Sequence, residues 1–234
     1  MESSLYLLIL LIEWIMLVTI AAPVFFAGRF RKKPTLGIFV WLTSIASSIV
    51  ASLWALVIAT GFIFESYFRL REGDDIGSVL ILSFAPWLLL GFSGVLLALA
   101  NQRLSSLFVV SADPLDSLLG GRVVQKFRSA EVIELSLPDF FAMSKGRAIY
   151  LSKAVFELPA DQQEAVLQHE YGHIVLRHGA IKKFSHLIYQ LMPWVVASRA
   201  MKNEVDFLCE VAADNYALRR VMNKDLRAAR KLFV

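Results

Sequence analysis

Three long apolar segments occupy the first hundred residues, and they constrain the fold more than any other feature of the chain. They run from about Leu5 to Ala27, from about Leu36 to Phe64 and from about Ile76 to Ala100. At about 1.5 Å per residue, each is long enough to cross a hydrocarbon core of about 30 Å as an α-helix. The whole chain is 57% hydrophobic and only 19% charged, which excludes a wholly soluble or disordered protein. We therefore predict a transmembrane domain of three helices over 1–101.

The charges between these segments predict how the chain is oriented in the membrane. The first loop has four basic residues and no acid between positions 29 and 33, whereas the second, 65–75, has two basic and four acidic residues. By the positive-inside rule, the first loop is cytoplasmic and the second is outside. The amino terminus is then outside, and everything after Arg103 lies in the cytoplasm.

The second half of the chain, residues 102–234, has a different pattern. It carries the whole net charge of +4, because the first 101 residues hold equal numbers of acids and bases. Short β-type runs at Leu107–Val110, Glu131–Leu137 and Ala148–Leu151 are separated by turn residues and predict a small sheet. The fold class we expect is a mainly α membrane protein with a small α+β domain on the cytoplasmic side.

A helix is predicted from about 161 to 177, with Asp161 as its N-cap and Glu164 completing a capping box. It contains the pattern His169-Glu170-Tyr-Gly-His173. Histidines four residues apart project from one face of a helix, so both imidazoles can bind a single Zn²⁺. Glu170 then faces the open coordination position, where it can take a proton from a zinc-bound water and pass it to a leaving amine. The pattern therefore predicts a catalytic site with one Zn²⁺ per chain.

A catalytic zinc needs a third protein ligand, and the sequence after His173 offers six candidates. They are His178, His186, Glu204, Asp206, Glu210 and Asp214. Glu210 and Asp214 are best placed, because their helical spacing lets Glu210 bind zinc while Asp214 reaches the free N–H of a ligand histidine. Cys209 points to another side of the same helix, and we interpret it as a packing residue.

These motifs resemble the gluzincin peptidases, in which HExxH is followed by a glutamate ligand and an aspartate four residues later. Three further features resemble those of the BlaR/MecR-type antirepressor membrane peptidases. They are the three preceding spans, the gap of 37 residues from His173 to Glu210 and the apolar stretch inside that gap. The related HtpX and CAAX prenyl protease family shares the segment Gly146–Ser152 and the pair Arg177-His178, but it usually has more membrane-crossing sequence before the third ligand. We therefore rank that family second.

The resemblance implies a role for each residue of the site. His169, His173 and Glu210 are expected to bind zinc, Glu170 to act as general base and acid, and Asp214 to orient a histidine. It also implies that Ala148–Ser152 is an edge strand on which an extended substrate docks. The transition-state stabiliser stays open among three candidates, Tyr216, His178 and Arg219. No sensor domain follows Val234, so we do not expect this chain itself to sense antibiotics.

Two further segments are interpreted from their charges. Phe184–Ala200 is apolar but short, with basic residues on both flanks, and we expect a re-entrant or interface-lying helix. The tail from Arg219 to Lys231 has six basic residues and one acid, which is typical of a solvated face near lipid headgroups. No nucleic-acid motif accompanies it, so no nucleic-acid partner is expected.

The sequence thus predicts a multi-pass membrane zinc metalloendopeptidase, in regulatory or quality-control proteolysis near the membrane. Its partners would be a protein or peptide substrate and the lipid bilayer, and the resemblance implies a bacterial cell membrane. The alternative is a catalytically idle zinc-binding sensor or scaffold, which would have no need of Glu170. An intramembrane peptidase of the site-two type is set aside, because the motif helix is rich in polar residues. The oligomeric state is open.

Overall fold

The computed structural model describes residues 2–73, 75–104 and 121–232. The chain divides into two compact units, which we describe separately. The first comprises Met1–Arg29, Phe39–Val109 and Ile188–Asn203, and the second comprises Phe30–Ile38, Val110–Leu187 and Glu204–Val234. The domain boundary predicted at 101/102 lies next to residues outside the described ranges, and it stays a prediction.

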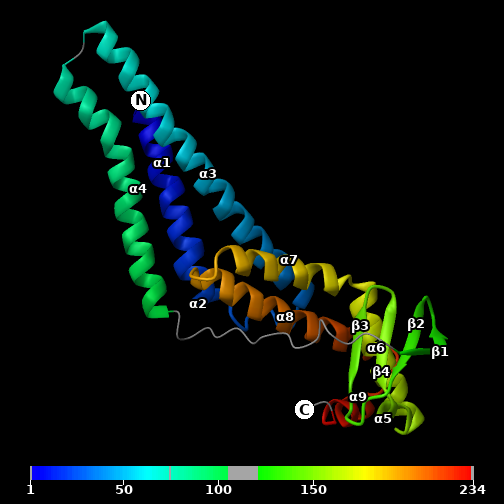
Figure 1. Ribbon diagram of the computed structural model, residues 1–234. Helices are drawn as coiled ribbons and strands as arrows, with labels where there is room; N and C mark the ends of the chain where they lie inside the picture. Colours follow the sequence, from blue (N-terminus) through cyan, green and yellow to red (C-terminus); the bar gives the residue numbers. More distant parts are fainter. Residues whose placement is uncertain (1, 74, 105–120, 233–234) are drawn as a thin grey trace. The chain divides into compact units, whose positions relative to one another are not determined.

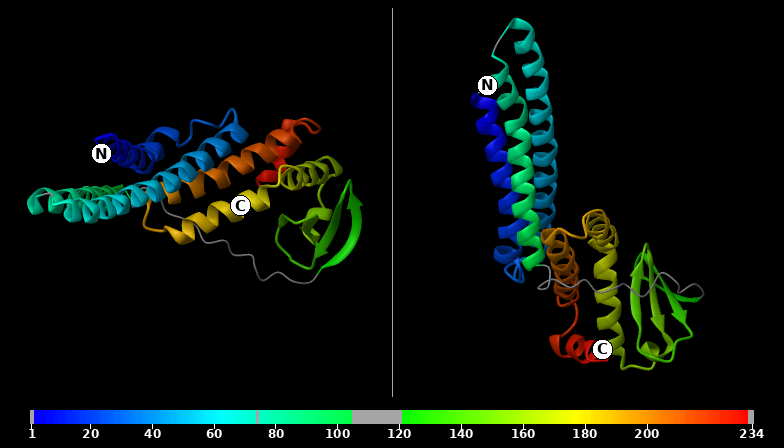
Figure 2. Two further views of the ribbon diagram at one scale, coloured as in Figure 1. Left: turned by 90° about the horizontal axis from the view of Figure 1, so that it is seen from above. Right: turned by 60° about the vertical axis from the view of Figure 1, so that its left-hand side comes forward.

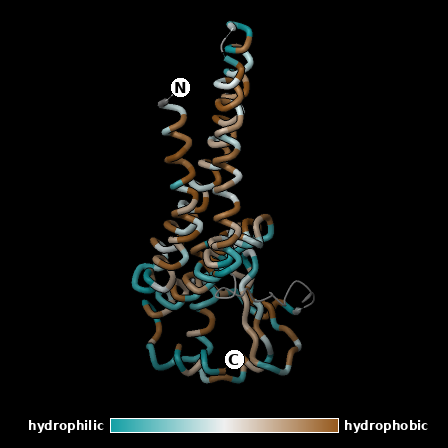
Figure 3. The backbone as a smooth tube through the Cα atoms, turned by 90° about the vertical axis from the view of Figure 1, so that its left-hand side faces the viewer, coloured by the Kyte–Doolittle hydropathy of each residue, from teal (hydrophilic) through white to brown (hydrophobic). Residues whose placement is uncertain are grey.

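In the described part of the chain, three helical segments are long and apolar enough to cross a membrane. The first, Ser3–Phe26, combines α1 (Glu2–Met16), a π-helical turn η1 (Leu17–Ala21) and α2 (Ala22–Phe26). The others are α3 (Pro34–Glu72) and α4 (Ile76–Leu104) (Figure 1). The three predicted spans are therefore present as helices, although α3 runs well past the expected end at Phe64. Figure 3 shows the apolar character along all three.

The three spans share a small apolar core and leave most of their surface exposed. Leu8 and Ile12 of the first span pack with Ala55 of α3 and with Leu89 and Leu90 of α4. In the most apolar stretch of α4, only 11% of the residues are buried. Helices with such an outer surface suit a hydrocarbon environment, because their backbone groups are satisfied within each helix. The chain therefore has the features of a membrane protein.

The second unit contains a four-stranded sheet. Its strands are β1 (Arg122–Phe127), β2 (Ala130–Leu135), β3 (Ala142–Lys145) and β4 (Ala148–Ser152), in the order β1-β2-β4-β3. β2 and β4 are parallel, and the other two pairs are antiparallel. The predicted runs at 131–137 and 148–151 are confirmed as β2 and β4, whereas Leu107–Val110 lies outside the described residues. β1 and β3 were not predicted from the sequence, because neither strand alternates apolar and polar residues clearly.

The prediction that Ala148–Ser152 is an edge strand is wrong, because β4 pairs with β2 on one side and with β3 on the other. The edge on this side of the sheet is β3. The N–H of Ser152 donates to the carbonyl of Phe141, which fixes the alternation of hydrogen bonds along the β3–β4 pair. By that alternation, the backbone N–H and C=O groups of Ala142 and Ser144 point away from β4, toward the side of β3 that pairs with no described strand.

Five further helices follow the sheet in the described residues. They are α5 (Lys153–Phe156), α6 (Ala160–Val175), α7 (His178–Leu191), α8 (Val196–Ala217) and α9 (Asn223–Arg230). α6 lies against the sheet, as Figure 2 shows, and its Val166 packs in one core with Val132 of β2 and Leu151 of β4. The helix predicted over 161–177 is thus present, as Ala160–Val175, and packs on the sheet.

The predicted capping box is wrong. Pro159 occupies the N-cap position of α6, so Asp161 lies inside the first turn. There its carboxylate interacts favourably with the helix dipole, but it cannot cap the helix. Glu164 is engaged elsewhere, because its Oε1 accepts a hydrogen bond from Gln168 Nε2 at 2.6 Å.

The segment Phe184–Ala200, for which a re-entrant or interface-lying helix is predicted, is divided between two helices. α7 ends at Leu191 and α8 begins at Val196, with Pro193 in the turn between them. A proline removes a backbone donor and clashes with the preceding turn of a helix, so α7 does not continue through it. The backbone N–H of Val196 donates instead to Asn101 Oδ1 at 2.7 Å, which satisfies one donor at the start of α8.

Candidate metal centre

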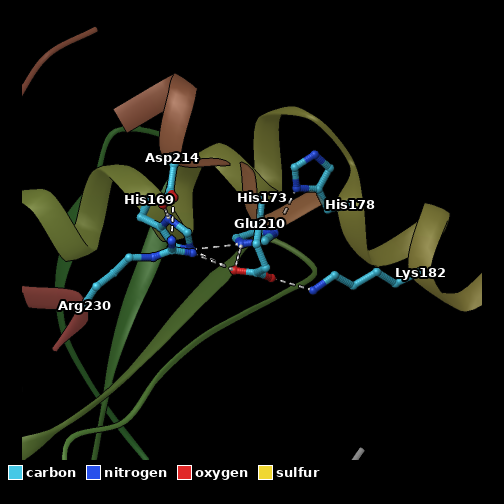
Figure 4. A network of polar contacts seen from close by, with 7 residues as sticks. All are labelled: His169, His173, His178, Lys182, Glu210, Asp214 and Arg230. Carbon is cyan, nitrogen blue, oxygen red and sulfur yellow. Dashed lines mark hydrogen bonds and ion pairs between the residues drawn. The ribbon is translucent and has the colours of Figure 1, made fainter. Parts of the chain in front are cut away.

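Three side chains from two helices converge on one point in the second unit (Figure 4). His169 and His173 lie one turn apart on α6, and their Nε2 atoms are 3.2 Å apart. Glu210 projects from α8, with Oε2 at 3.3 Å from His169 Nε2 and 3.5 Å from His173 Nε2. One ligand atom from each residue lies within 4.8 Å of the others, as around a shared metal ion. Of the six candidates for a third ligand, the structure brings Glu210 to the histidine pair.

Gly172 allows α8 to approach α6 closely enough for this arrangement. A Cβ built on Gly172 would lie 3.2 Å from Cβ of Tyr216 and 3.3 Å from Cα of Ala213. These distances are shorter than most real Cβ contacts, so a larger residue would require Tyr216 or Ala213 to shift by a few tenths of an ångström. Gly172 therefore allows the close approach of α6, which carries the histidines, and α8, which carries the carboxylates.

Asp214, one turn after Glu210, orients His169. Its Oδ1 lies 2.9 Å from His169 Nδ1, so the imidazole is held with Nδ1–H donating to the carboxylate and Nε2 facing the convergence point. The other oxygen, Oδ2, accepts from Arg230 Nη1 at 2.7 Å. This is the geometry expected from the spacing of Glu210 and Asp214.

Glu210 is held by a lysine on α7. Lys182 Nζ donates to Glu210 Oε1 at 2.8 Å, leaving Oε2 for the histidines. Arg230 Nη2 lies 4.0 Å from Glu210 Oε2. Burial alone would raise the pKa of Glu210, but the hydrogen bonds with His169 and His173 and the charge of Lys182 hold it well below its usual range. Glu210 is therefore a carboxylate at neutral pH.

The same interactions change the pKa of the two neighbouring bases. Burial would lower the pKa of His169, but its hydrogen bonds to Asp214 and Glu210 outweigh burial and raise it to about 9. The pKa of Lys182 is raised against the effect of burial by the charge and hydrogen bond of Glu210. A divalent cation would compete with the proton for His169, because its positive charge also interacts favourably with the nearby carboxylates.

A cavity of about 450 Å³ opens beside the convergence point. Its polar wall includes His169, Glu170, Glu210 and Arg230, and its apolar wall is formed by Ala142, Val166, Leu226 and Ala229. The side chain of Glu170 is buried but borders this cavity. Glu170 thus belongs to the wall of the cavity, together with His169 and Glu210.

The three candidates for transition-state stabilisation lie elsewhere, and none is among the residues that line the cavity. Tyr216 Oη accepts from Arg128 Nη1 at 3.4 Å, and Arg219 is exposed in the turn after α8. His178 is fully buried behind His173, with Nδ1 at 2.9 Å from His173 Nδ1. Burial, together with the nearby His173 and Lys182, lowers the pKa of His178 to about 3, so it is neutral.

Two basic residues of the site were not identified from the sequence. Arg230 belongs to the tail that was interpreted as a solvated face, and Lys182 was interpreted as a basic flank. The helical pattern of α9 contained a signal, because buried Leu226 and Ala229 place one side of that helix against the core. For Lys182 we find no signal, since its contact with Glu210 depends on the turn between α6 and α7.

Comparison with known families supports a metallopeptidase. Residues 124–233, a little under half of the chain, match the family model described as Peptidase family M48. The match supports a metallopeptidase of family M48, and thus a protein or peptide as substrate, but it does not separate the antirepressor type from the HtpX type. No match was found among curated proteins or among solved structures.

Proposed function

We propose that the chain is a membrane-bound zinc metalloendopeptidase with Glu170 as general base and acid. The observation that carries the proposal is the convergence of His169, His173 and Glu210 beside a cavity bordered by Glu170. The match to Peptidase family M48 over 124–233 supports it independently.

The residues present fit zinc. Two imidazoles and one carboxylate are a catalytic zinc set, which leaves a fourth position for water, and one Zn²⁺ per chain is the proposed cofactor. When bound, zinc would polarise the scissile carbonyl and acidify the bound water. Glu170 would accept the proton of that water at its carboxylate and transfer it to the leaving amine. Asp214 would keep His169 in the tautomer that leaves Nε2 free for the metal.

We propose that the substrate binds as an extended strand along β3. The outward N–H and C=O groups of Ala142 and Ser144 provide hydrogen bonds for such a strand, and Ala142 also lines the cavity. The apolar wall formed by Val166, Leu226 and Ala229 favours an apolar side chain next to the scissile bond. This assignment replaces the edge strand that the sequence had predicted at 148–152.

The membrane part of the proposal rests on the apolar helices and on loop charges. The loop charges support an outside amino terminus and a cytoplasmic catalytic domain, and the family resemblance of the sequence supports a bacterial cell membrane. Phe184 and Leu187 of α7 are about half exposed, which supports a helix lying at the membrane interface. A catalytic domain in this position would act on substrates near the membrane, in regulatory or quality-control proteolysis. The finer resemblance, first to the BlaR/MecR type and second to the HtpX type, stays a proposal from sequence.

The experiment measures zinc per chain and cleavage of an unfolded protein in detergent-purified samples. We expect one zinc in wild type and in Glu170→Gln, none in His169→Ala, and cleavage by wild type alone. The matched control is Glu157→Gln, an exposed glutamate at the end of α5, which is expected to behave as wild type. Zinc without cleavage of any substrate would favour the idle sensor or scaffold, and wild type without zinc would overturn the proposal.

A further inference from the structure

His178 is the most buried polar group next to the proposed zinc ligands, and its place in the chain explains how it gets there. α6 ends at Val175, and Arg177 adopts a left-handed conformation with φ of 55°. The chain turns at this residue, and α7 begins at the next one, His178. His178 is only 1% exposed, and its Nδ1 lies 2.9 Å from Nδ1 of His173.

The direction of this hydrogen bond follows from the chemistry of His173. Its Nε2 faces His169 and Glu210, so a metal at that point is bound through Nε2. An imidazole that binds a metal through Nε2 carries its proton on Nδ1, and this proton needs an acceptor. The atom within reach is Nδ1 of His178, which must then be unprotonated, with the proton of His178 on Nε2.

We infer that His178 is a positioning residue for the proposed zinc site, which holds His173 in the metal-binding tautomer and orientation through an Nδ1–H···Nδ1 hydrogen bond. It does for His173 what Asp214 does for His169. The inference rests on the proposed function, and it replaces the role of transition-state stabiliser that the sequence had left open for His178. A stabiliser would have to reach the cavity, whereas His178 lies on the far side of the His173 ring.

Side-chain shape offers a direct test. An asparagine can place its amide oxygen close to where histidine has Nδ1, whereas a glutamine places it further out, near the position of Nε2. His178→Asn should therefore keep an acceptor for His173, while His178→Gln and His178→Leu should lose it. A role in packing alone would not distinguish asparagine from glutamine in this order, because glutamine matches the volume of histidine better.

The experiment measures zinc affinity of the full chain in detergent by competition with a chelator, and the visible spectrum of the same samples loaded with Co²⁺. We expect affinity to fall about 10- to 100-fold in His178→Leu and His178→Gln, and to fall by less than about threefold in His178→Asn. The Co²⁺ spectrum should be altered in the first two variants and preserved in the third. His186→Leu, on the same helix, is the matched control and should bind zinc as wild type does.

Thermal unfolding of the metal-free proteins shows whether each variant is folded. Unchanged zinc affinity in folded His178→Leu, or equal losses in His178→Asn and His178→Gln, would overturn the positioning role while leaving the proposed zinc site intact. Unchanged zinc affinity with a large drop in turnover would instead indicate that His178 stabilises the transition state. Failure of wild type to bind zinc would instead overturn the proposed function itself.

Discussion

Gly172 and Tyr216 touch where α6 meets α8, and a Cβ on Gly172 would stand 3.2 Å from Cβ and from Cδ1 of Tyr216. We therefore expect Gly172→Ala to weaken zinc binding, because Glu210 and Asp214 move away from the histidines as the helices separate. A glycine-to-alanine change inside a helix normally stabilises by about 0.5–1 kcal/mol, so a loss here runs against the intrinsic propensity. Gly172→Val should be worse, with overpacking that costs about 1–3 kcal/mol.

The control for this prediction is Gly179→Ala on α7, where nothing lies within 4 Å of an added Cβ. It should leave zinc affinity and thermal stability unchanged or slightly raised. Zinc affinity in Gly172→Ala equal to that of the control would show that the contact between α6 and α8 does not set the geometry of the site.

Asp214→Asn is expected to weaken zinc binding about 10- to 100-fold. The carboxylate accepts the Nδ1 proton of His169 at 2.9 Å, and an amide is a weaker acceptor that can also turn its NH₂ group toward the ring. Chelator competition measures the loss. Asp161→Asn, an exposed acid in the first turn of α6, is the matched control, and an equal loss in both variants would argue against orientation of His169.

The ligand set shows how far sequence reasoning reaches. Helical spacing alone was enough to place His169 and His173 together, because the geometry of one helix fixes the distance between positions i and i+4. The same reasoning placed Glu210 and Asp214 on one face of a second helix. That α8 would meet α6 at Gly172 does not follow from spacing, since it depends on packing between segments far apart in the chain.

The errors have the same origin. β4 is strongly apolar and was recognised as a strand, yet its neighbours in the sheet depend on β3, which has no clear pattern of its own. Charge dominates the composition of the basic tail and predicts a solvated face, and its six basic residues are exposed. The contact of Arg230 with Asp214 was not predicted, because it depends on the burial of Leu226 and Ala229, which decides which way α9 faces. Local sequence identifies elements well, but it does not identify their partners.

Arg230→Met should reduce peptide cleavage several-fold while changing bound zinc little. The guanidinium neutralises Asp214 through a 2.7 Å contact, lines the cavity and is half exposed, so its interaction with the carboxylate is partly screened by solvent. Cleavage assays at low and high salt measure the effect. Arg227→Met, exposed on the same helix, is the control, and equal activities of the two variants at low salt would contradict a role for Arg230.

Ser144→Pro tests the docking edge. Proline is tolerated where a strand N–H faces away from its neighbour, so the sheet should keep its structure while one outward donor is lost. We expect KM for a peptide substrate to rise with zinc content unchanged. Met143→Pro is the matched contrast, because the N–H of Met143 points toward β4, and it should destabilise the sheet itself. Unchanged KM in Ser144→Pro would exclude binding along β3 at this position.

Cys209 is fully buried in α8, and burial raises the pKa of its thiol from 9.0 to about 12. The thiolate is the form that reacts with maleimides, so in the native protein we expect almost no labelling at pH 8. The thiol ionises near pH 9 in the unfolded chain and near pH 12 in the folded chain. The free energy of unfolding therefore falls as the pH rises above 9. Labelling native and denatured samples from pH 7 to 10, followed by mass spectrometry, measures this. Native labelling at the rate of the denatured chain would show that the α8 core opens freely, and the packing role assigned to Cys209 would then be wrong.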